Sequence, residues 1–367
     1  MRTHSIQINT KTKKYSIIIG HNVIKNISNI LTKQNITFEK CLIVIDNNIP
    51  AKFKSTLIKE LKVKKIIVYK FNAREKNKNY QNVNQIHKVL FKNRFNREDC
   101  IISFGGGITG DVVGFASSTF KRGIKYINIP STLLSQVDSS IGGKTGINNK
   151  FGKNLIGSFY QPELVISDIK ILNSLPQREI ICGYAEILKS SLIDSYRNFN
   201  FLDKNIIKIL KLKSPFIEKA IINSCMLKKK IVEKDEKEKN LRKILNFGHT
   251  FAHAYEATLK YSKLNHGEAV LLGIDSASKF SFNNNLLSNI EFNLIKNHLQ
   301  QPILSMNLKK KFSLKDLNYI ISFMQQDKKN TTKKINLILL KKIGKPIFNL
   351  NFDSKNLYNF LKRELTN

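Results

Sequence analysis

Three histidines near the middle of the C-terminal half form the densest group of metal-binding side chains in the sequence. His249, His253 and His266 lie within 18 residues, although the whole chain has only seven histidines. His249 and His253 are four residues apart, so one face of a helix would carry both imidazoles. Neutral imidazoles combined with a carboxylate suit Zn²⁺ and leave one coordination position for a substrate. This spacing alone predicts His249 and His253 as ligands of a metal ion.

The third ligand of such a site has two candidates. Glu186 lies in the segment GYAEILK, and Glu268 follows His266 by two residues. The sequence HExxH does not occur, so a metalloprotease of that type is not indicated. The alternative to a metal site is a pair of helical histidines that satisfy other polar groups.

A glycine-rich segment, Gly105-Gly106-Gly107-Ile108-Thr109-Gly110-Asp111, could hold a phosphate group. It follows the apolar run CIISF and precedes VVGFASSTF, which is typical of a helix start. Glycines let backbone N–H groups approach a pyrophosphate, and a helix N-terminus favours the anion. No acidic residue follows about 20 positions later to hold a ribose. A glycine-rich turn without a ligand is therefore the alternative.

A second polar and glycine-rich stretch covers residues 135–162. It contains Asp138, Lys144, Lys153 and Asn154 among glycines. Lysines spaced through such backbone can converge on one anion as point charges. In so lysine-rich a chain, ordinary surface lysines are the alternative interpretation.

The elements that would position these residues are of two kinds. The first 100 residues alternate between strand and helix patterns, which predicts a parallel sheet with ligands at the carboxyl ends of its strands. Long amphipathic helical patterns follow after about residue 170. We therefore expect an α/β domain over residues 1–170 and an all-α domain over residues 171–367. Strands are predicted at residues 40–48, 64–71 and 99–107, and a helix at residues 82–93.

Length and composition exclude several classes of protein. A chain of 367 residues corresponds to about two domains, and 41% hydrophobic with 24% charged residues excludes wholesale disorder. No apolar run reaches the roughly 18 residues of a membrane span, and lysines interrupt the N-terminus where a signal peptide needs an apolar core. We expect a cytoplasmic protein. The cysteines, which are expected to be free thiols, are Cys41, Cys100, Cys182 and Cys225.

The net charge of +35 raises the possibility of a nucleic-acid partner. Lysine outnumbers arginine by 53 to 9, however, and bidentate phosphate and base recognition favours arginine. The lysine runs are no longer than three residues, and tryptophan is absent. We interpret the charge as compositional bias on a solvated surface and expect no nucleic-acid partner and no membrane association.

Taken together, these segments resemble the 3-dehydroquinate synthase family. The resemblance covers about residues 40–345, in the order in which the motifs occur in the family. It implies a Rossmann-like NAD-binding α/β domain, an all-α C-terminal domain and an active site in the cleft between them. The matching segments are GGGITGDVVGFASSTFKRG, IPSTLLSQVDSSIGGKTGIN, FGKNLIGSFYQP, LPQREIICGYAEILK, LRKILNFGHTFAH and LNHGEAV.

The resemblance also implies a ligand set that differs from the one expected from spacing. One Zn²⁺ or Co²⁺ would be held by Glu186, His249 and His266, and His253 would instead contact the substrate near its phosphate. Arg122 would reach the phosphate pocket of the neighbouring subunit, which implies a homodimer. The other residues implied to line the substrate site are Asp138, Lys144, Lys153, Asn154, Lys189, Lys228, Arg242 and Asn246.

The implied NAD contacts lie in several short segments of the N-terminal half. One of them departs from the family, because Ala73-Arg74 replaces an Asp-Gly pair before Glu75, while Glu75 and Lys78 keep their spacing. The segment Asp327–Lys329 also resembles the family, with no contact assigned to Lys328 or Lys329. The implied NAD contacts are Asp46, Glu75, Lys78, Gly107, Ile108, Thr109, Gly110, Asp111, Ser131, Thr132, Lys144, Lys153, Ile171, Leu172, Asn173 and Ser174.

The activity that the resemblance implies is a cyclisation in the shikimate pathway. The substrate would be the sugar phosphate 3-deoxy-D-arabino-heptulosonate 7-phosphate, and the products 3-dehydroquinate and phosphate. NAD would oxidise C5 transiently, phosphate would leave by β-elimination, and re-reduction, ring opening and an intramolecular aldol step would follow. Another sugar phosphate cyclase or a metal-dependent polyol dehydrogenase on the same scaffold is the alternative.

Overall fold

The computed structural model describes residues 3–261, 263–304, 306–325 and 334–366. The chain forms two compact units, the first comprising Met1–Ile180 and Leu212–Lys237, the second Ile181–Lys211 and Glu238–Asn367. The predicted single boundary at residue 170 therefore differs from the observed division. The difference arises because helix α7 (Phe216–Lys234) returns to the first unit, where Lys228 pairs with Asp138.

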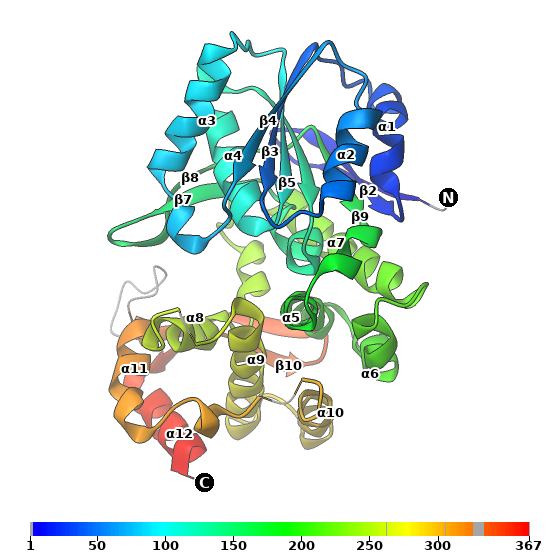
Figure 1. The fold of residues 1–367 in the computed structure, drawn as a ribbon. Helices are drawn as coiled ribbons and strands as arrows, with labels where there is room; N and C mark the ends of the chain where they lie inside the picture. Colours follow the sequence, from blue (N-terminus) through cyan, green and yellow to red (C-terminus); the bar gives the residue numbers. More distant parts are fainter. Residues whose placement is uncertain (1–2, 262, 305, 326–333, 367) are drawn as a thin grey trace. The chain divides into compact units, whose positions relative to one another are not determined.

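The first unit is built on a seven-stranded sheet with the strand order β1-β2-β9-β6-β5-β3-β4 (Figure 1). β1 is antiparallel to β2, and the other pairings are parallel. The predicted parallel α/β architecture is thus confirmed. Its strands are β1 (His4–Asn9), β2 (Lys14–Gly20), β3 (Lys40–Asp46), β4 (Lys65–Phe71), β5 (Cys100–Gly105), β6 (Lys125–Pro130) and β9 (Leu164–Asp168). Its helices, besides α7, are α1 (Ile27–Lys33), α2 (Ala51–Glu60), α3 (Tyr80–Lys92) and α4 (Gly107–Thr119).

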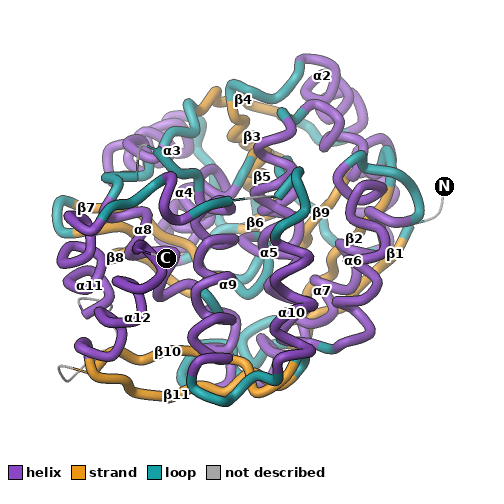
Figure 2. The backbone as a smooth tube through the Cα atoms, turned by 90° about the horizontal axis from the view of Figure 1, so that it is seen from below, coloured by secondary structure: helices purple, strands orange, loops and turns teal. Residues whose placement is uncertain are grey.

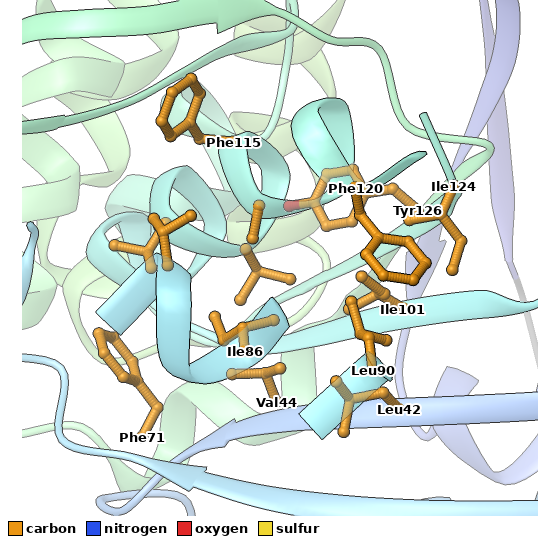
Figure 3. Close-up of a cluster of buried hydrophobic side chains, with 14 of the residues drawn as sticks. Leu42, Val44, Phe71, Ile86, Leu90, Ile101, Phe115, Phe120, Ile124 and Tyr126 are labelled. Carbon is orange, nitrogen blue, oxygen red and sulfur yellow. The ribbon is translucent and has the colours of Figure 1, made fainter. Parts of the chain in front are cut away.

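Helices α3 and α4 cover one face of this sheet, and α1 and α2 lie on the other side (Figure 1). Both faces of the central strands are consequently buried, which explains why β3 and β5 are predominantly apolar along their length rather than alternating. Figure 3 shows the core beneath α3 and α4, where Leu42 and Val44 of β3 pack with Ile86 and Leu90 of α3. Strand β5 ends at Gly105 and α4 begins at Gly107, so the start of α4 lies at the carboxyl end of a central strand.

A separate antiparallel hairpin, β7 (Lys144–Asn149) and β8 (Gly152–Phe159), packs beside α4. Close contact is possible because Gly114 of α4 faces Thr145, and a Cβ on this glycine would lie 2.4 Å from the Thr145 Cγ2. The polar stretch identified from sequence thus forms an ordered hairpin attached to the sheet through α4.

The second unit is predominantly helical, as predicted. The all-α prediction is wrong in one respect, because the second unit also contains an antiparallel hairpin of two strands, β10 (Lys334–Lys342) and β11 (Lys345–Asp353) (Figure 2). β10 buries Ile335 and the run from Leu337 to Leu340, so the middle of this strand is covered on both faces. The elements are α6 (Tyr196–Leu210), α8 (His249–Thr258), α9 (His266–Asn283), α10 (Asn289–Leu299), α11 (Leu317–Gln325), β10 (Lys334–Lys342), β11 (Lys345–Asp353) and α12 (Ser354–Thr366). Helix α5 (Gln177–Asp194) begins in the first unit and continues in the second.

None of the helices in the described part of the chain carries the apolar stretch that a bilayer span requires. The segment Asp327–Lys329, noted from its resemblance to the family, lies outside the described residues.

Candidate active site

Three potential metal ligands meet within the second unit. The ligand atoms of Glu186, His249 and His266 all lie within 4.8 Å of one another. The Oε1 atom of Glu186 is 3.4 Å from His249 Nε2 and 3.6 Å from His266 Nε2. The structure thus brings together the three residues expected from the family resemblance. The pair predicted from spacing, His249 and His253, is not the pair in this cluster. His253 is exposed, and its ring lies edge-on to that of His249, with ring centroids 5.3 Å apart.

Each of the three ligands comes from a different helix, and two glycines permit these helices to approach. Gly267 of α9 lies against α5, where a Cβ would be 2.2 Å from the Cys182 Cα. Gly273 of α9 lies against the start of α8, where a Cβ would be 2.2 Å from the Gly248 carbonyl oxygen. Helix α9 is therefore in backbone contact with the helices that carry the other two ligands.

The two histidines are each fixed at the first position of a helix. Gly248 precedes His249 with φ +77°, a conformation that favours glycine. His266 follows the capping residue Asn265, whose side chain accepts a hydrogen bond from the Glu268 N–H, while Glu268 Oε2 accepts one from the Asn265 N–H. Glu268 is thereby engaged in capping α9, and Glu186 is the carboxylate that faces both imidazoles.

The donor set suits a divalent cation. The Glu186 side chain is only 2% exposed, and neither of its oxygens makes a hydrogen bond of ordinary geometry among the described residues. Lys189 forms an ion pair with Oε2. A buried carboxylate with free acceptor capacity beside two imidazole nitrogens is the combination that Zn²⁺ or Co²⁺ binds. The three residues therefore fit such a metal.

The same contacts perturb the titration of the cluster. Burial alone would raise the pKa of Glu186, but Lys189 and the two imidazoles outweigh it and hold this pKa well below its usual range. Burial and the Lys189 charge lower the pKa of His249. Burial also opposes protonation of His266, yet the adjacent carboxylates of Glu186 and Glu256 raise its pKa to about 10. A bound cation would take the place of that proton, so metal binding and proton release are coupled here.

A short helical turn in the second unit carries two of the polar residues implied to bind substrate. Arg242 and Asn246 lie in the 3₁₀ turn Leu241–Asn246, and the Arg242 side chain is buried. Asn246 Nδ2 donates a 2.8 Å hydrogen bond to Glu238 Oε1. The turn leads directly into Gly248 and His249, so Arg242 and Asn246 share one segment with a candidate metal ligand.

In the first unit, the residues implied to contact NAD gather at the carboxyl ends of neighbouring strands. Gly107, Ile108, Thr109, Gly110 and Asp111 form the N-terminal turn of α4, directly after β5. Ser131 and Thr132 follow β6, and the Ser131 N–H donates to the Gly105 carbonyl at 2.9 Å. This edge of a parallel sheet, with a helix N-terminus, is suited to an anionic ligand. Also at strand ends are Asp46, which closes β3, and Ile171, Leu172, Asn173 and Ser174, in the turn after β9.

The loop that departs from the family still makes close contacts with this edge. Lys78 is 5% exposed and forms an ion pair with Asp111. Burial raises the pKa of Asp111, and the Lys78 charge opposes that effect. Glu75 lies 3.8 Å from the Lys153 ammonium. Replacement of Asp-Gly by Ala73-Arg74 has thus left both Glu75 and Lys78 within the cluster.

The remaining implied residues occupy the first unit as well. Lys228 of α7 donates a 2.7 Å hydrogen bond to Asp138 Oδ1, within the turn Ser135–Ser139. Lys144 begins β7 with an exposed side chain, and Lys153 and Asn154 lie on β8. Arg122 is exposed at the end of a turn after α4, with φ +65°.

Two residues in these contacts were not identified by sequence analysis. Asn148 joins the loop at Glu75 to the hairpin, and Glu256 lies 3.5 Å from His266 Nδ1. The only signal for Asn148 was its place in the glycine-rich stretch. Glu256 follows His253 by three residues, which puts it on the histidine-bearing side of the helix.

The sheet topology and the ligand cluster define a two-unit α/β protein with a candidate divalent metal centre. A family model described as 3-dehydroquinate synthase N-terminal matches residues 68–182, and one described as 3-dehydroquinate synthase C-terminal matches residues 183–330. The chain belongs to the 3-dehydroquinate synthase family.

Individual relatives agree with this assignment along nearly the whole chain. The 3-dehydroquinate synthase of Pelagibacter ubique is 60% identical over 362 residues, covering 98% of each chain. That of Dictyoglomus thermophilum is 41% identical over 359 residues, covering 97% of each. A solved structure of 2-deoxy-scyllo-inosose synthase, complexed with carbaglucose-6-phosphate, NAD⁺ and Co²⁺, superimposes with a TM-score of 0.88 at 25% identity, covering 98% of this chain and 100% of that one.

Proposed function

We propose that this chain converts 3-deoxy-D-arabino-heptulosonate 7-phosphate into 3-dehydroquinate and phosphate. Membership of the family supports the reaction, and 60% identity to one curated relative favours it over another sugar phosphate cyclase or a polyol dehydrogenase. The observation that carries the proposal is the cluster of Glu186, His249 and His266, whose three side chains converge from three helices.

We propose that NAD⁺ and a Zn²⁺ or Co²⁺ ion serve the reaction. When bound, NAD⁺ accepts and returns a hydride, and the metal polarises substrate oxygens. The support is the donor set of the cluster and the NAD⁺ and Co²⁺ in the structure of the 2-deoxy-scyllo-inosose synthase. The N-terminal turn of α4 would hold the pyrophosphate through its backbone N–H groups, with Lys78 and Asp111 beside it.

The chain's own polar residues would hold the substrate through the reaction. Lysines and Arg242 offer cations for its carboxylate, and Asn246 offers an amide for its hydroxyls. Fixing these groups lets successive steps proceed without repositioning. We infer this set of residues from the family resemblance. The other residues proposed to hold it through its carboxylate and hydroxyls are Asp138, Lys153, Lys189 and Lys228.

We propose that the phosphate is bound by Lys144, Asn154 and His253, with Arg122 contributed by a neighbouring subunit. Cationic and amide donors stabilise the negative charge that the leaving phosphate gains. The phosphate oxygen itself would accept the proton lost in the elimination, so the scheme assigns no separate protein base. Because Arg122 of one subunit completes the phosphate site of the other, each active site would depend on the neighbouring subunit.

We propose a homodimer that works in the cytoplasm. The exposed position of Arg122 supports a contact with a second copy of the chain. Light scattering coupled to size-exclusion chromatography would give twice the 42.2 kDa chain mass for a dimer. A monomeric mass together with full activity would contradict the role given to Arg122.

The decisive experiment measures phosphate release from the proposed substrate with NAD⁺ and Zn²⁺, while absorbance reports NADH. Wild type should release phosphate in a metal-dependent manner without net NADH, and His249→Ala should not. His4→Ala removes an exposed histidine and is the matched control. Net NADH would indicate a dehydrogenase. Metal and NAD⁺ binding without phosphate release would indicate another cyclase substrate.

A further inference from the structure

The β7–β8 hairpin is irregular where it meets the loop around residue 75. Ile147 pairs with Ile156, whereas Asn149 pairs with Gly152. Between these pairs, Asn148 alone stands opposite residues 153–155, which form a bulge on β8. Such bulges are frequent next to active sites because they redirect side chains. This one contains Lys153 and Asn154, both placed in the proposed site.

The bulge imposes an unfavourable backbone conformation on one of its residues. Asn154 has φ +54°, in the left-handed region that most residues avoid. Asparagine tolerates this region better than most side chains do, but the conformation persists only where its surroundings hold it. The partner strand cannot do so with a regular ladder, because the register is broken at this point.

The Asn148 side chain supplies the missing contact. Its Oδ1 accepts a 2.9 Å hydrogen bond from the Asn154 backbone N–H. Its Nδ2 donates a 2.7 Å hydrogen bond to Glu75 Oε1, and its own backbone N–H donates to the Lys78 carbonyl at 2.7 Å. A planar amide presents a donor and an acceptor at once, so one side chain can join the bulge to the loop.

The groups that depend on this joint are charged and lie close together. Glu75 Oε1 is 3.8 Å from the Lys153 ammonium. Lys78 Nζ donates to both Asp111 and the Asn154 side-chain oxygen. Movement of the bulge would therefore displace Lys153 and Lys78, which are proposed to bind NAD⁺, and Asn154, which is proposed to bind the substrate phosphate.

We propose that Asn148 is a positioning residue that holds the bulge of β8 and the 75–78 loop in one arrangement. It acts through Asn154 and Glu75 rather than by touching a ligand, and its effect on NAD⁺ affinity rests on the proposed function. Loss of its side chain releases the Asn154 backbone and leaves Glu75 without its amide donor. The fold does not depend on it, because Asn148 is only half-buried and lies at the end of a hairpin.

The test compares three variants with wild type and with the control Lys150→Ala, which alters an exposed residue in the same hairpin turn. Asn148→Ala removes both side-chain contacts. Asn148→Asp keeps the acceptor for the Asn154 N–H but places a carboxylate against Glu75. The double variant Asn148→Asp with Glu75→Gln restores the second hydrogen bond with donor and acceptor exchanged.

The first readout is hydrogen–deuterium exchange of the peptide covering residues 150–156 in the protein without ligands. Exchange in Asn148→Ala should be about tenfold faster, which corresponds to the loss of ~1.4 kcal/mol of local protection. Asn148→Asp and Lys150→Ala should exchange like wild type. Exchange unchanged in Asn148→Ala would overturn the proposal, whatever the protein binds.

The second readout is the Kd for NAD⁺, with the melting temperature as a check on folding. Asn148→Ala and Asn148→Asp should each bind NAD⁺ about tenfold more weakly than wild type. Because Glu75 is itself proposed to contact NAD⁺, the double variant is compared with Glu75→Gln alone, and its Kd should lie within about threefold of that reference. A further tenfold loss on adding Asn148→Asp to Glu75→Gln would contradict the joint between residues 148 and 75. Failure of wild type to bind NAD⁺, with the exchange pattern as expected, would count against the proposed function alone.

Discussion

The contact between α8 and α9 gives the sharpest test of how this fold builds its candidate metal centre. Gly273 of α9 lies against the backbone of Gly248, the residue that directly precedes the candidate ligand His249 at the start of α8. In Gly273→Ala, the new Cβ would lie 2.2 Å from the Gly248 carbonyl oxygen and 3.1 Å from the Ala252 Cβ. Carbon and oxygen ordinarily meet at about 3.3 Å. The helices must therefore separate by about 1 Å, because the obstructing atom belongs to the backbone.

That displacement is large compared with the tolerance of a metal site. Ligand distances in such sites are held within about 0.2 Å, so a shift of about 1 Å removes His249 or His266 from the coordination sphere. We expect Zn²⁺ affinity to fall at least about 100-fold, more than is usual for residues that only support a ligand. Crowding of the interface should also lower the free energy of unfolding by about 1–3 kcal/mol.

Competition with a chromophoric chelator measures the Zn²⁺ affinity directly, and thermal melting reports the loss of stability. Ser278→Ala is the matched control, since it places the same side chain on α9 and removes a buried hydroxyl that has no hydrogen bond among the described residues. A Gly273→Ala protein that binds Zn²⁺ as tightly as Ser278→Ala would refute the argument. A protein that melts earlier but keeps its affinity would show that the helix contact stabilises the fold without setting the ligand geometry.

Three further predictions concern other parts of the chain. Glu256→Gln should weaken Zn²⁺ binding about tenfold, because it removes the charge that orients His266 through Nδ1; unchanged chelator competition would contradict this. The hydrogen bond from His298 holds the pKa of Asp203 below its ordinary value, so its stabilisation is present above about pH 4 and is lost as pH falls through the folded pKa. Asp203→Ala should therefore lower the free energy of unfolding by about 1 kcal/mol at pH 7 and by less at pH 3, as urea titrations would show. Burial raises the pKa of Cys225 to about 12, so this thiol should resist a disulfide reagent at pH 8 until the protein is denatured; rapid labelling of native protein, mapped by mass spectrometry, would contradict the burial.

The strands near the candidate site could be predicted because their signals are local. The strand expected at residues 40–48 is β3, and the one expected at 64–71 is β4. The third strand ends at Gly105, where the glycine-rich turn begins, rather than at residue 107. Apolar runs that end in polar or glycine residues indicate both the strand and the sheet edge at which ligands bind.

Long-range contacts account for what sequence reasoning could not supply. Helix α7 has the same amphipathic pattern as the helices of the second unit, yet it belongs to the first. Its place depends on pairings such as Lys228 with Asp138, which lie 90 residues apart in sequence. The choice between Glu186 and Glu268 was likewise open, because only the structure shows that Glu268 caps α9. Spacing within one helix also favoured His253 over His266, since it carries no information about a second helix.

Glycine acts in this chain in two physically different ways, and only one of them leaves a local signal. The glycines around α4 form a dense segment, so the close approach of backbone to an anion could be anticipated from the sequence. Gly267 and Gly273 are isolated glycines of α9, and Gly273 lies in the helix interior, where glycine normally lowers helix stability. Their value arises from α5 and α8, whose backbones occupy the space that a Cβ would take. An isolated glycine kept in a helix therefore indicates a close helix contact, and here both contacts lie beside candidate metal ligands.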